Sequence, residues 1–269
     1  MILYKYMSFN AAVSVLANKS IGFSCLEDFN DPFECTSFGF KDYNDTLTSN
    51  VATIAFKNNF SRKFGVLSLT RQPLNPLMWA HYGDSHRGVV IGFDVTLCGF
   101  NEIESNVIPF QYGDIIYTST KPHRNIEIPD SSVLMSIGSH RSFGLDSFDL
   151  LKKAFLYKSL EWAYEEEVRV VKNISDIPYS YYVGEGVYEY WTQIQMFGRP
   201  LYCFRIPPNS IKEVYLGKNF SHNYSKGEAV SKEELREKVA GWKSDGYEVY
   251  KCHTNLDTWS LRSTDAYYI

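Results

Sequence analysis

Apolar and polar residues alternate, or apolar residues form short runs, along several stretches of the chain. A period of two, or a short apolar run bounded by turn residues, predicts a β-strand. Strands are therefore expected at residues 2–6 (ILYKY), 65–70 (GVLSLT) and 88–94 (GVVIGFD). Further strands are predicted at residues 21–24, 201–206, 211–217 and 247–252, and the last of these is expected to end the sheet.

Apolar positions three and four residues apart predict helices elsewhere in the chain. Helices are expected after Ser8, over residues 77–83, after Ser147, and after the capping-box sequence of residues 231–234. Residues 38–63 are expected to form a connecting helix or excursion. Since strands and helices do not strictly alternate, an α+β fold is favoured over a doubly wound parallel sheet. No linker or repeat interrupts residues 1–269, which predicts a single domain.

Composition narrows the possible classes of protein. Hydrophobic residues make up 44% of the 269 residues and aromatic residues 16%, which is enough apolar material for a core. The net charge of −4 gives no general attraction for nucleic acid. Such a target would need a local basic patch, and the candidates are Lys57/Arg62/Lys63/Arg71 and Lys152/Lys153/Lys158.

Several familiar motifs do not occur in the sequence. The phosphate-binding GxxxxGK[ST], the dinucleotide-binding GxGxxG, the zinc-binding HExxH and the hydrolase GxSxG are all missing, so those chemistries have no support. The five cysteines are scattered without metal-like spacing, and no metal is expected. No apolar run reaches the length of a membrane span, which predicts a soluble, cytoplasmic protein.

The sequence Trp162-Ala-Tyr-Glu-Glu-Glu-Val-Arg-Val-Val171 carries three consecutive acids into a β-branched run. Alternation would place Glu167 and Arg169 on one face of a strand. A carboxylate held at a strand start in partly dry surroundings can stabilise a cation that develops on a substrate. The alternative is that residues 165–167 form a solvated strand edge that prevents aggregation. Arg169 would pair with Glu165 or Glu167 under either interpretation.

Three groups of short motifs occur in order along the chain. They are Leu3-Tyr-Lys-Tyr6 with Phe29-Asn-Asp-Pro-Phe-Glu34, Ser68-Leu-Thr-Arg-Gln72 with Met78-Trp-Ala-His-Tyr-Gly83, and Trp162-x-Tyr-Glu-x-Glu-x-Arg169. Together they strongly resemble the bacterial domain-of-unknown-function family 2971. More distantly, the layout is similar to that of the DarT toxins, which transfer ADP-ribose to DNA.

The DarT resemblance implies a split, mostly antiparallel sheet like that of ADP-ribosyltransferases. It implies Glu167 as the catalytic acid and Arg71 as the arginine that holds the pyrophosphate of NAD. An aromatic ring would stack on nicotinamide or adenine. The residues expected to bind NAD are Tyr4, Lys5, Tyr6, Asn30, Phe33, Trp79, His81 and Tyr82.

The function implied by this resemblance is NAD-dependent mono-ADP-ribosyl transfer to a macromolecule, without a metal. A nucleic acid, RNA or DNA, is favoured over a protein as acceptor. The implied setting is a bacterial toxin or an anti-phage defence effector, with an antitoxin protein as a possible partner. Two alternatives stay open: the same site is an NAD glycohydrolase if water is the acceptor, or the domain is a non-catalytic module that binds a nucleotide or a peptide.

Structural roles compete with these assignments for several residues. Residues 30–32 (Asn-Asp-Pro) are typical of a turn, because Asx side chains bond the backbone and proline restricts it. His81 is more often a buried core histidine than a catalyst. Trp79 and Trp162 are expected in the core.

Overall fold

The computed structural model of the chain describes residues 1–34, 62–122, 138–175, 180–184, 187–196, 198–220 and 231–266. The excursion expected over residues 38–63 therefore lies outside the described residues, apart from its last two positions. The described part of the chain contains no helix that is long and apolar enough to cross a membrane.

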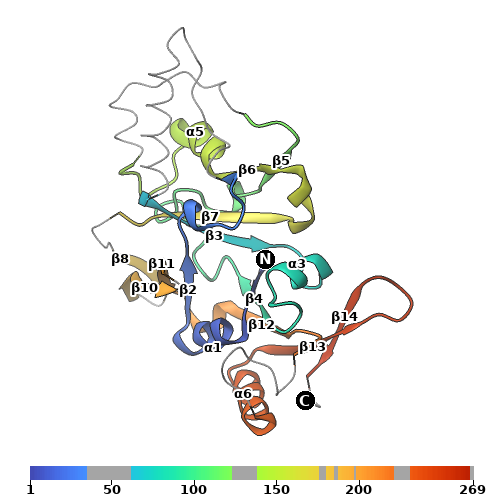
Figure 1. Cartoon of the computed structure of the whole chain (residues 1–269). Helices are drawn as coiled ribbons and strands as arrows, with labels where there is room; N and C mark the ends of the chain where they lie inside the picture. The colour runs from blue at the N-terminus through green and yellow to red at the C-terminus, as the bar shows by residue number, and fades with distance from the viewer. Residues whose placement is uncertain are drawn as a thin grey trace.

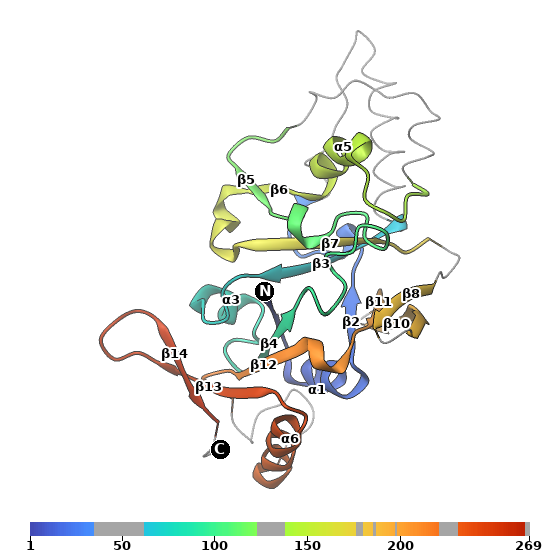
Figure 2. The ribbon, with the colours of Figure 1, turned by 180° about the vertical axis from the view of Figure 1, so that it is seen from behind.

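A seven-stranded sheet forms the centre of the molecule (Figures 1 and 2). Its strands, in spatial order, are β14 (Leu261–Asp265), β13 (Glu248–Thr254), β12 (Ile211–Leu216), β4 (Val89–Asp94), β1 (Ile2–Met7), β3 (Phe64–Thr70) and β7 (Glu167–Asn173). Every neighbouring pair is antiparallel except β12 and β13. The fold is therefore α+β, as the lack of strict alternation predicted, and its large sheet is mixed and mostly antiparallel.

The sheet is split between β1 and β3. Strands β1 and β4 pair along the whole of β1, and β3 and β7 pair along the whole of both strands. In contrast, the described strands β1 and β3 pair at a single position, where Tyr4 lies opposite Thr70. The two halves of the sheet thus diverge from this point.

Three smaller sheets accompany the large one. The first has the order β10 (Thr192–Met196), β11 (Arg199–Arg205), β2 (Ser20–Phe23); the others pair β5 (Ile116–Thr118) with β6 (Tyr157–Ser159) and β8 (Ser180–Gly184) with β9 (Val187–Tyr190). The strand expected at residues 247–252 exists as β13, but it does not end the sheet. A hairpin continues the chain into β14, which pairs with β13 and forms the edge.

The helices are α1 (Phe9–Asn18), α3 (Pro76–His81), α5 (Leu145–Phe155) and α6 (Lys232–Ser244), with 3₁₀ turns η1 (Leu26–Asp28), η3 (Phe110–Tyr112), η4 (Leu160–Glu165) and η5 (Pro208–Ser210). Ser8 caps α1 and Ser231 caps α6 through their hydroxyl oxygens, as predicted. The prediction for Ser147 was wrong. Helix α5 begins two residues earlier, and the Ser147 hydroxyl instead donates to the carbonyl of Gly144 (3.2 Å).

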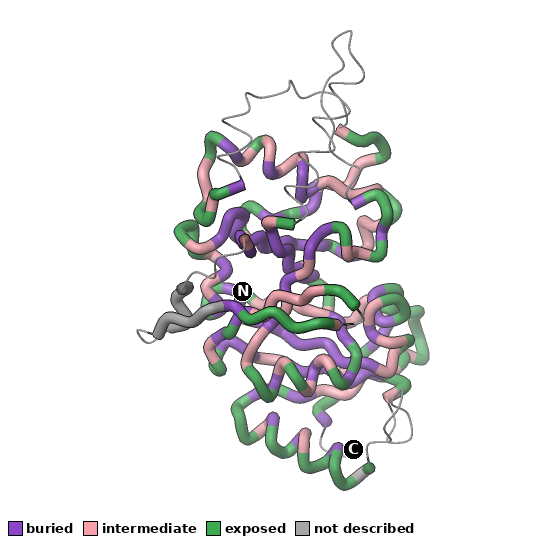
Figure 3. The backbone as a smooth tube through the Cα atoms, turned by 60° about the vertical axis from the view of Figure 1, so that its left-hand side comes forward, coloured by how far each residue is buried: buried purple, intermediate pink, exposed green. Residues whose placement is uncertain are grey.

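The buried residues form three clusters around the sheet (Figure 3). The largest contains one face of β1 and β4 with α1 and α6, and the second packs α5 against β3 and β7. The third lies on the opposite face, where Trp79 of α3 contacts the ring of Tyr6 (5.3 Å between centroids). Because side chains alternate across a strand, the pattern of β1 supplies apolar residues to both faces.

Candidate functional site

A cavity of about 770 Å³ opens where β1 and β3 diverge. Both halves of the sheet contribute to its wall, since Tyr4, Lys5 and Tyr6 come from β1 and Ser68 to Thr70 from β3. The remaining lining residues come from the loop after η1, from α3 and the residue that follows it, from β6 and from the acidic segment; they are Phe29, Asn30, Met78, His81, Tyr82, Lys158, Glu165 and Glu167.

A left-handed backbone turn places two of the three consecutive acids on this cavity. The 3₁₀ turn η4 ends at Glu165, and Glu166 follows with φ 45°. The chain then enters β7 at Glu167. As a result Glu165 and Glu167 are 3% and 5% exposed, whereas Glu166 points to solvent. The interpretation of these acids as a solvated edge is wrong for Glu165 and Glu167.

Hydrogen bonds hold this acidic turn against the neighbouring strands. The Thr70 hydroxyl donates to the Glu165 carbonyl (2.5 Å), and the Glu167 N–H donates to the Tyr117 hydroxyl (2.9 Å). Each bond joins the turn to a different sheet, because Thr70 ends β3 and Tyr117 lies in β5. The positions of the two carboxylates are therefore set by the tertiary structure.

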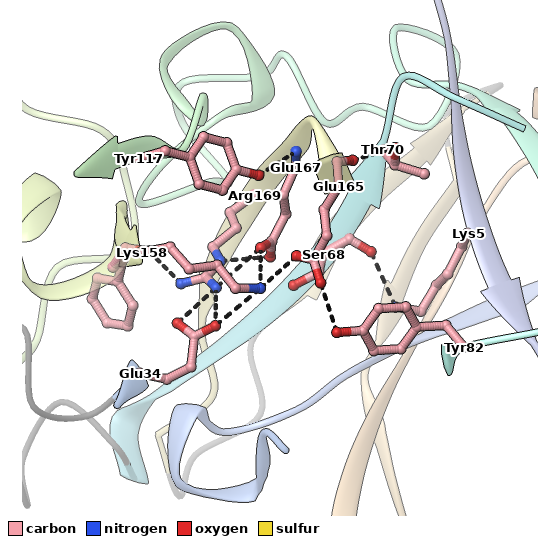
Figure 4. A network of polar contacts seen from close by, with 11 residues as sticks. Lys5, Glu34, Ser68, Thr70, Tyr82, Tyr117, Lys158, Glu165, Glu167 and Arg169 are labelled. Carbon is pink, nitrogen blue, oxygen red and sulfur yellow. Dashed lines mark hydrogen bonds and ion pairs between the residues drawn. The ribbon is translucent and has the colours of Figure 1, made fainter. Parts of the chain in front are cut away.

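The two carboxylates belong to a buried network of ion pairs (Figure 4). The Lys158 Nζ lies 2.5 Å from Glu165, 2.9 Å from Glu167 and 3.3 Å from Glu34. The Arg169 guanidinium lies 2.7 Å from Glu167 and 2.8 Å from Glu34, and it also donates to the carbonyl of Phe155 (2.6 Å). Three carboxylates thus share two cations away from bulk water.

The surroundings shift the pKa values of Glu165 and Glu167 in opposite directions. Burial opposes ionisation of Glu167, but the nearby charges of Arg169 and Lys158 outweigh it and hold the pKa of Glu167 well below its usual range. For Glu165, burial is the dominant effect and raises the pKa, despite the attraction of Lys158. The Tyr82 hydroxyl donates to Glu165 (2.6 Å). One carboxylate is therefore held ionised and the other is shifted toward taking up a proton.

Lys5 supplies a further cation to the cavity. Its Nζ donates to the Ser68 carbonyl (3.1 Å) across the split in the sheet. Burial lowers the pKa of Lys5 to about 8, with a smaller opposing effect from Glu167. Lys5 is thus protonated at neutral pH but close to titration.

Comparison with known proteins places part of the chain in a family. Residues 78–170 match the family model DUF2971, which is described as a protein of unknown function. The predicted family assignment is confirmed over this segment. No curated protein and no solved structure matches the chain.

The residues that line the cavity between β1 and β3 lie partly inside and partly outside the DUF2971 segment. His81, Tyr82, Lys158, Glu165 and Glu167 lie within residues 78–170. Strands β1 and β3 both lie before it. The cavity therefore joins the DUF2971 segment to the N-terminal strands.

The structure brings most of the predicted site residues together. Tyr4, Lys5, Tyr6, Asn30, His81, Tyr82 and Glu167 all line the cavity. Among the residues with a competing structural role, His81 is exposed and does not lie in the core. The turn predicted from Asn-Asp-Pro is also present and begins at Asp31, whose carboxylate accepts from the Phe33 N–H (2.9 Å).

Three predicted site residues lie elsewhere. Trp79 is fully buried in the core, where its indole N–H donates to the Pro73 carbonyl (2.9 Å). Phe33 is 59% exposed and lines a separate cavity of about 200 Å³. Arg71 pairs with Asp114 (2.7 Å) on the surface. The assignment of these three to the NAD site is corrected accordingly, and Trp162, which was expected in the core, is only partly buried.

The sequence interpretation missed the roles of three residues in the buried ion-pair network at the cavity. Glu165 was considered as a partner for Arg169 or as part of a solvated strand edge; Arg169 pairs with Glu167, the other predicted partner, and with Glu34. Lys158 was assigned to a surface basic patch, but its side chain is 6% exposed. Glu34 was noted only as the end of a turn motif. Its distance from Arg169 in the sequence left no local signal for their contact.

Among the described residues, no group of three or more His, Cys, Asp and Glu side chains is arranged to hold a metal ion.

If the cavity binds NAD, as the DarT resemblance implies, replacing Arg71 by lysine is expected to leave the affinity unchanged. Arg71 is outside the cavity and its ion pair is largely exposed, so the stability change should stay within about ±0.5 kcal/mol. Calorimetric titration of NAD into wild type and Arg71→Lys provides the test. A clear loss of affinity would return Arg71 to the site.

Proposed function

We propose that this protein is an NAD-dependent mono-ADP-ribosyltransferase that modifies a macromolecule, with a nucleic acid favoured as acceptor. The observation that carries the proposal is the pair of carboxylates, Glu165 and Glu167, on the wall of one aromatic cavity in a split sheet. Their environments push their pKa values apart, which is how an active site divides roles between two acids. The distant resemblance to DarT adds the setting of a toxin or defence effector with an antitoxin partner.

The cavity has suitable size and lining for a dinucleotide substrate. Its volume of about 770 Å³ lies within the usual range for sites of small molecules. Tyr4, Tyr6, Phe29 and Tyr82 supply aromatic surface for stacking of the base or nicotinamide ring. Lys5 supplies a positive charge for the pyrophosphate, the role that the sequence had assigned to Arg71.

Glu167 would act on the ribose attached to nicotinamide. When the bond between the ribose C1′ and nicotinamide breaks, the electron pair leaves with neutral nicotinamide and positive charge develops on the ribose. An ionised carboxylate that is already in place stabilises this charge. Arg169 and Lys158 hold Glu167 ionised and fixed through three hydrogen bonds, and a carboxylate has about four lone-pair sites, which leaves one for a ribose hydroxyl.

Glu165 would act on the acceptor. Its raised pKa suits a general base that takes the proton of the attacking group while that group forms a bond to C1′. Tyr82 and Lys158 hold the Glu165 carboxylate in position through contacts of 2.6 and 2.5 Å. If water took the place of the acceptor, the same arrangement would hydrolyse NAD.

Incubation of the purified protein with NAD tests the proposal directly. Nicotinamide release reports cleavage, and mass spectrometry of added RNA, DNA and protein reports transfer of ADP-ribose. Release with transfer supports the proposal, whereas release without any transfer indicates a glycohydrolase. No release with any acceptor, together with NAD or nucleotide binding in calorimetry, indicates a non-catalytic binding module and overturns the proposal.

Replacing Lys5 by glutamine is expected to weaken NAD binding by roughly ten- to a hundredfold. This is the usual effect of removing a hydrogen bond to a charged group, about 1.5–3 kcal/mol. In the wild type, affinity should also fall as the pH rises through about 8, because Lys5 then loses the proton that attracts phosphate. Calorimetry at about pH 7 and pH 9 measures both effects, with Arg71→Lys as the matched control.

The Lys5 variant should show a much flatter pH profile than the wild type. An unchanged affinity in Lys5→Gln, or a wild-type affinity that does not vary over this pH range, would contradict the role of Lys5.

A further inference from the structure

The hairpin formed by β13 and β14 carries the most exposed large apolar side chains among the described residues. Trp259 is fully exposed and Leu256 is 90% exposed. Both lie in the tip that joins the two strands, which projects from the sheet on the side of α3 (Figures 1 and 2). An aromatic ring presented in this way is free to make a stacking contact.

The tip is an ordered turn. The Asn255 N–H donates to the Ser260 carbonyl (3.0 Å), and the Asp257 N–H donates to the Asn255 side chain (3.0 Å). The hydroxyls of Thr258 and Ser260 are 2.6 Å apart. These bonds restrict the backbone on either side of Trp259, so a ligand would meet a largely pre-arranged surface.

A second cavity, of about 380 Å³, lies between the hairpin tip, the start of α3 and the end of β12. Trp259 and Pro76 provide apolar surface, Asn219 and Asn255 provide amides, and Lys218 and His86 provide cationic or ring nitrogen groups. Although the chain as a whole has a net charge of −4, no acidic residue is among the described residues that line this cavity. The His86 ring lies parallel to the buried Trp79 ring (11°, 6.4 Å between centroids), which fixes that part of the wall.

We propose that this hairpin cavity docks a single strand of nucleic acid, with Trp259 stacking on a base and Lys218 contacting the phosphate backbone. Proteins that bind single strands combine aromatic platforms with positive charge in this way. The absence of acids from the lining and the presence of amide and hydroxyl groups favour a nucleic acid over an apolar peptide. The strand would be the acceptor, so this inference rests on the proposed function.

Residues of helix α3 line both the hairpin cavity, which is the proposed dock, and the catalytic cavity. Its first residue, Pro76, lines the hairpin cavity, whereas Met78 and His81 of the same helix line the cavity with Glu165 and Glu167. A helix of this length spans about 9 Å, the height of roughly three stacked bases. A strand held at Trp259 could therefore present a nearby nucleotide to the carboxylates.

Fluorescence anisotropy with labelled oligonucleotides of about 12 nucleotides tests the dock without NAD. The probes are single-stranded RNA, single-stranded DNA of the same sequence, and the corresponding duplex. We expect a single strand to bind more tightly than the duplex, and the comparison of RNA with DNA identifies the acceptor.

Trp259→Ala should weaken binding about tenfold or more. Lys218→Gln should weaken binding to all single strands and lower the salt dependence by about one released counterion.

Two matched variants control for general surface effects. Leu145→Ala removes another exposed apolar side chain (74% exposed), and Lys238→Gln removes another surface lysine. Both should bind oligonucleotide like the wild type. The inference is overturned if no single strand binds, if the duplex binds equally well, or if Trp259→Ala binds as tightly as Leu145→Ala.

Failure of the dock can be told apart from failure of the proposed function. Nicotinamide release measured without oligonucleotide reports only the catalytic cavity. Oligonucleotide binding without nicotinamide release would leave the dock standing and overturn the transferase. Nicotinamide release without oligonucleotide binding would support cleavage of NAD in the catalytic cavity and overturn the nucleic-acid dock. The search for the acceptor would then turn to proteins.

Discussion

Replacing Glu167 by glutamine should slow NAD consumption by at least about a hundredfold. Glutamine keeps the size of the side chain and removes the charge that we propose stabilises the developing cation on the ribose. Loss of one pre-arranged stabilising group in an active site has an effect of this size. Nicotinamide release by the purified variant, compared with the wild type at saturating NAD, measures it.

The buried network makes a stability control necessary for this experiment. Glu167 is a partner of both Arg169 and Lys158, so Glu167→Gln is also expected to destabilise the fold. Glu34→Gln is the matched control, because Glu34 pairs with the same two cations but does not line the cavity that we propose binds NAD. Circular dichroism and thermal unfolding define a temperature at which both variants remain folded.

At that temperature the two variants should differ in rate. Glu34→Gln should retain most of the wild-type NAD cleavage, whereas Glu167→Gln should lose it. Glu165→Gln should lose transfer to the acceptor more than cleavage of NAD, since the role proposed for Glu165 is to act on the attacking group. Equal rates in wild type and Glu167→Gln, or equal losses in Glu167→Gln and Glu34→Gln, would rule out a catalytic role for Glu167.

Replacing Arg169 by methionine should lower the free energy of unfolding by about 3–5 kcal/mol. Methionine fills a similar space but leaves Glu34 and Glu167 buried with only Lys158 to neutralise them, and losing one partner of a buried ion pair has this effect. Urea titration followed by tryptophan fluorescence measures the change. Arg71→Met, which breaks only the exposed pair with Asp114, is the matched control and should change stability by about 0.5 kcal/mol or less.

The pH dependence of stability provides a second readout of the same network. The pKa of Glu167 is lower in the folded protein than its ordinary value of 4.5, so the unfolded chain binds the proton more readily. The stabilising effect is present above that ordinary value and is lost as the pH falls below it. Arg169→Met should reduce this acid sensitivity. An Arg169→Met protein as stable as Arg71→Met would show that the network contributes little.

Local sequence patterns were sufficient for much of the fold. Alternation predicted β1, β3 and β4, and the hydroxyl caps at Ser8 and Ser231 were correct because a cap depends only on residues within one turn. The common face of Glu167 and Arg169 was also predictable, since it follows from the period of a strand. Even the short helix over residues 77–83 ends near its glycine as expected.

Contacts between segments far apart in the chain decided the rest. Nothing in the local sequence patterns of β1 and β3 indicated that the two strands would pair only at Tyr4 and Thr70. The cavity between the strands therefore follows from the packing of both halves of the sheet. The same holds for Glu34, which meets Arg169 across 135 positions of sequence. Arg71 was misplaced for the same reason: its residue type suits a pyrophosphate, but the strand end that carries it directs it to Asp114 at the surface. Residue chemistry and local spacing therefore determined which side chains were candidates for the site. The geometry of the sheet decided which of these candidates lie together in one desolvated cavity. Burial and charge neutralisation depend on neighbours that no local pattern encodes.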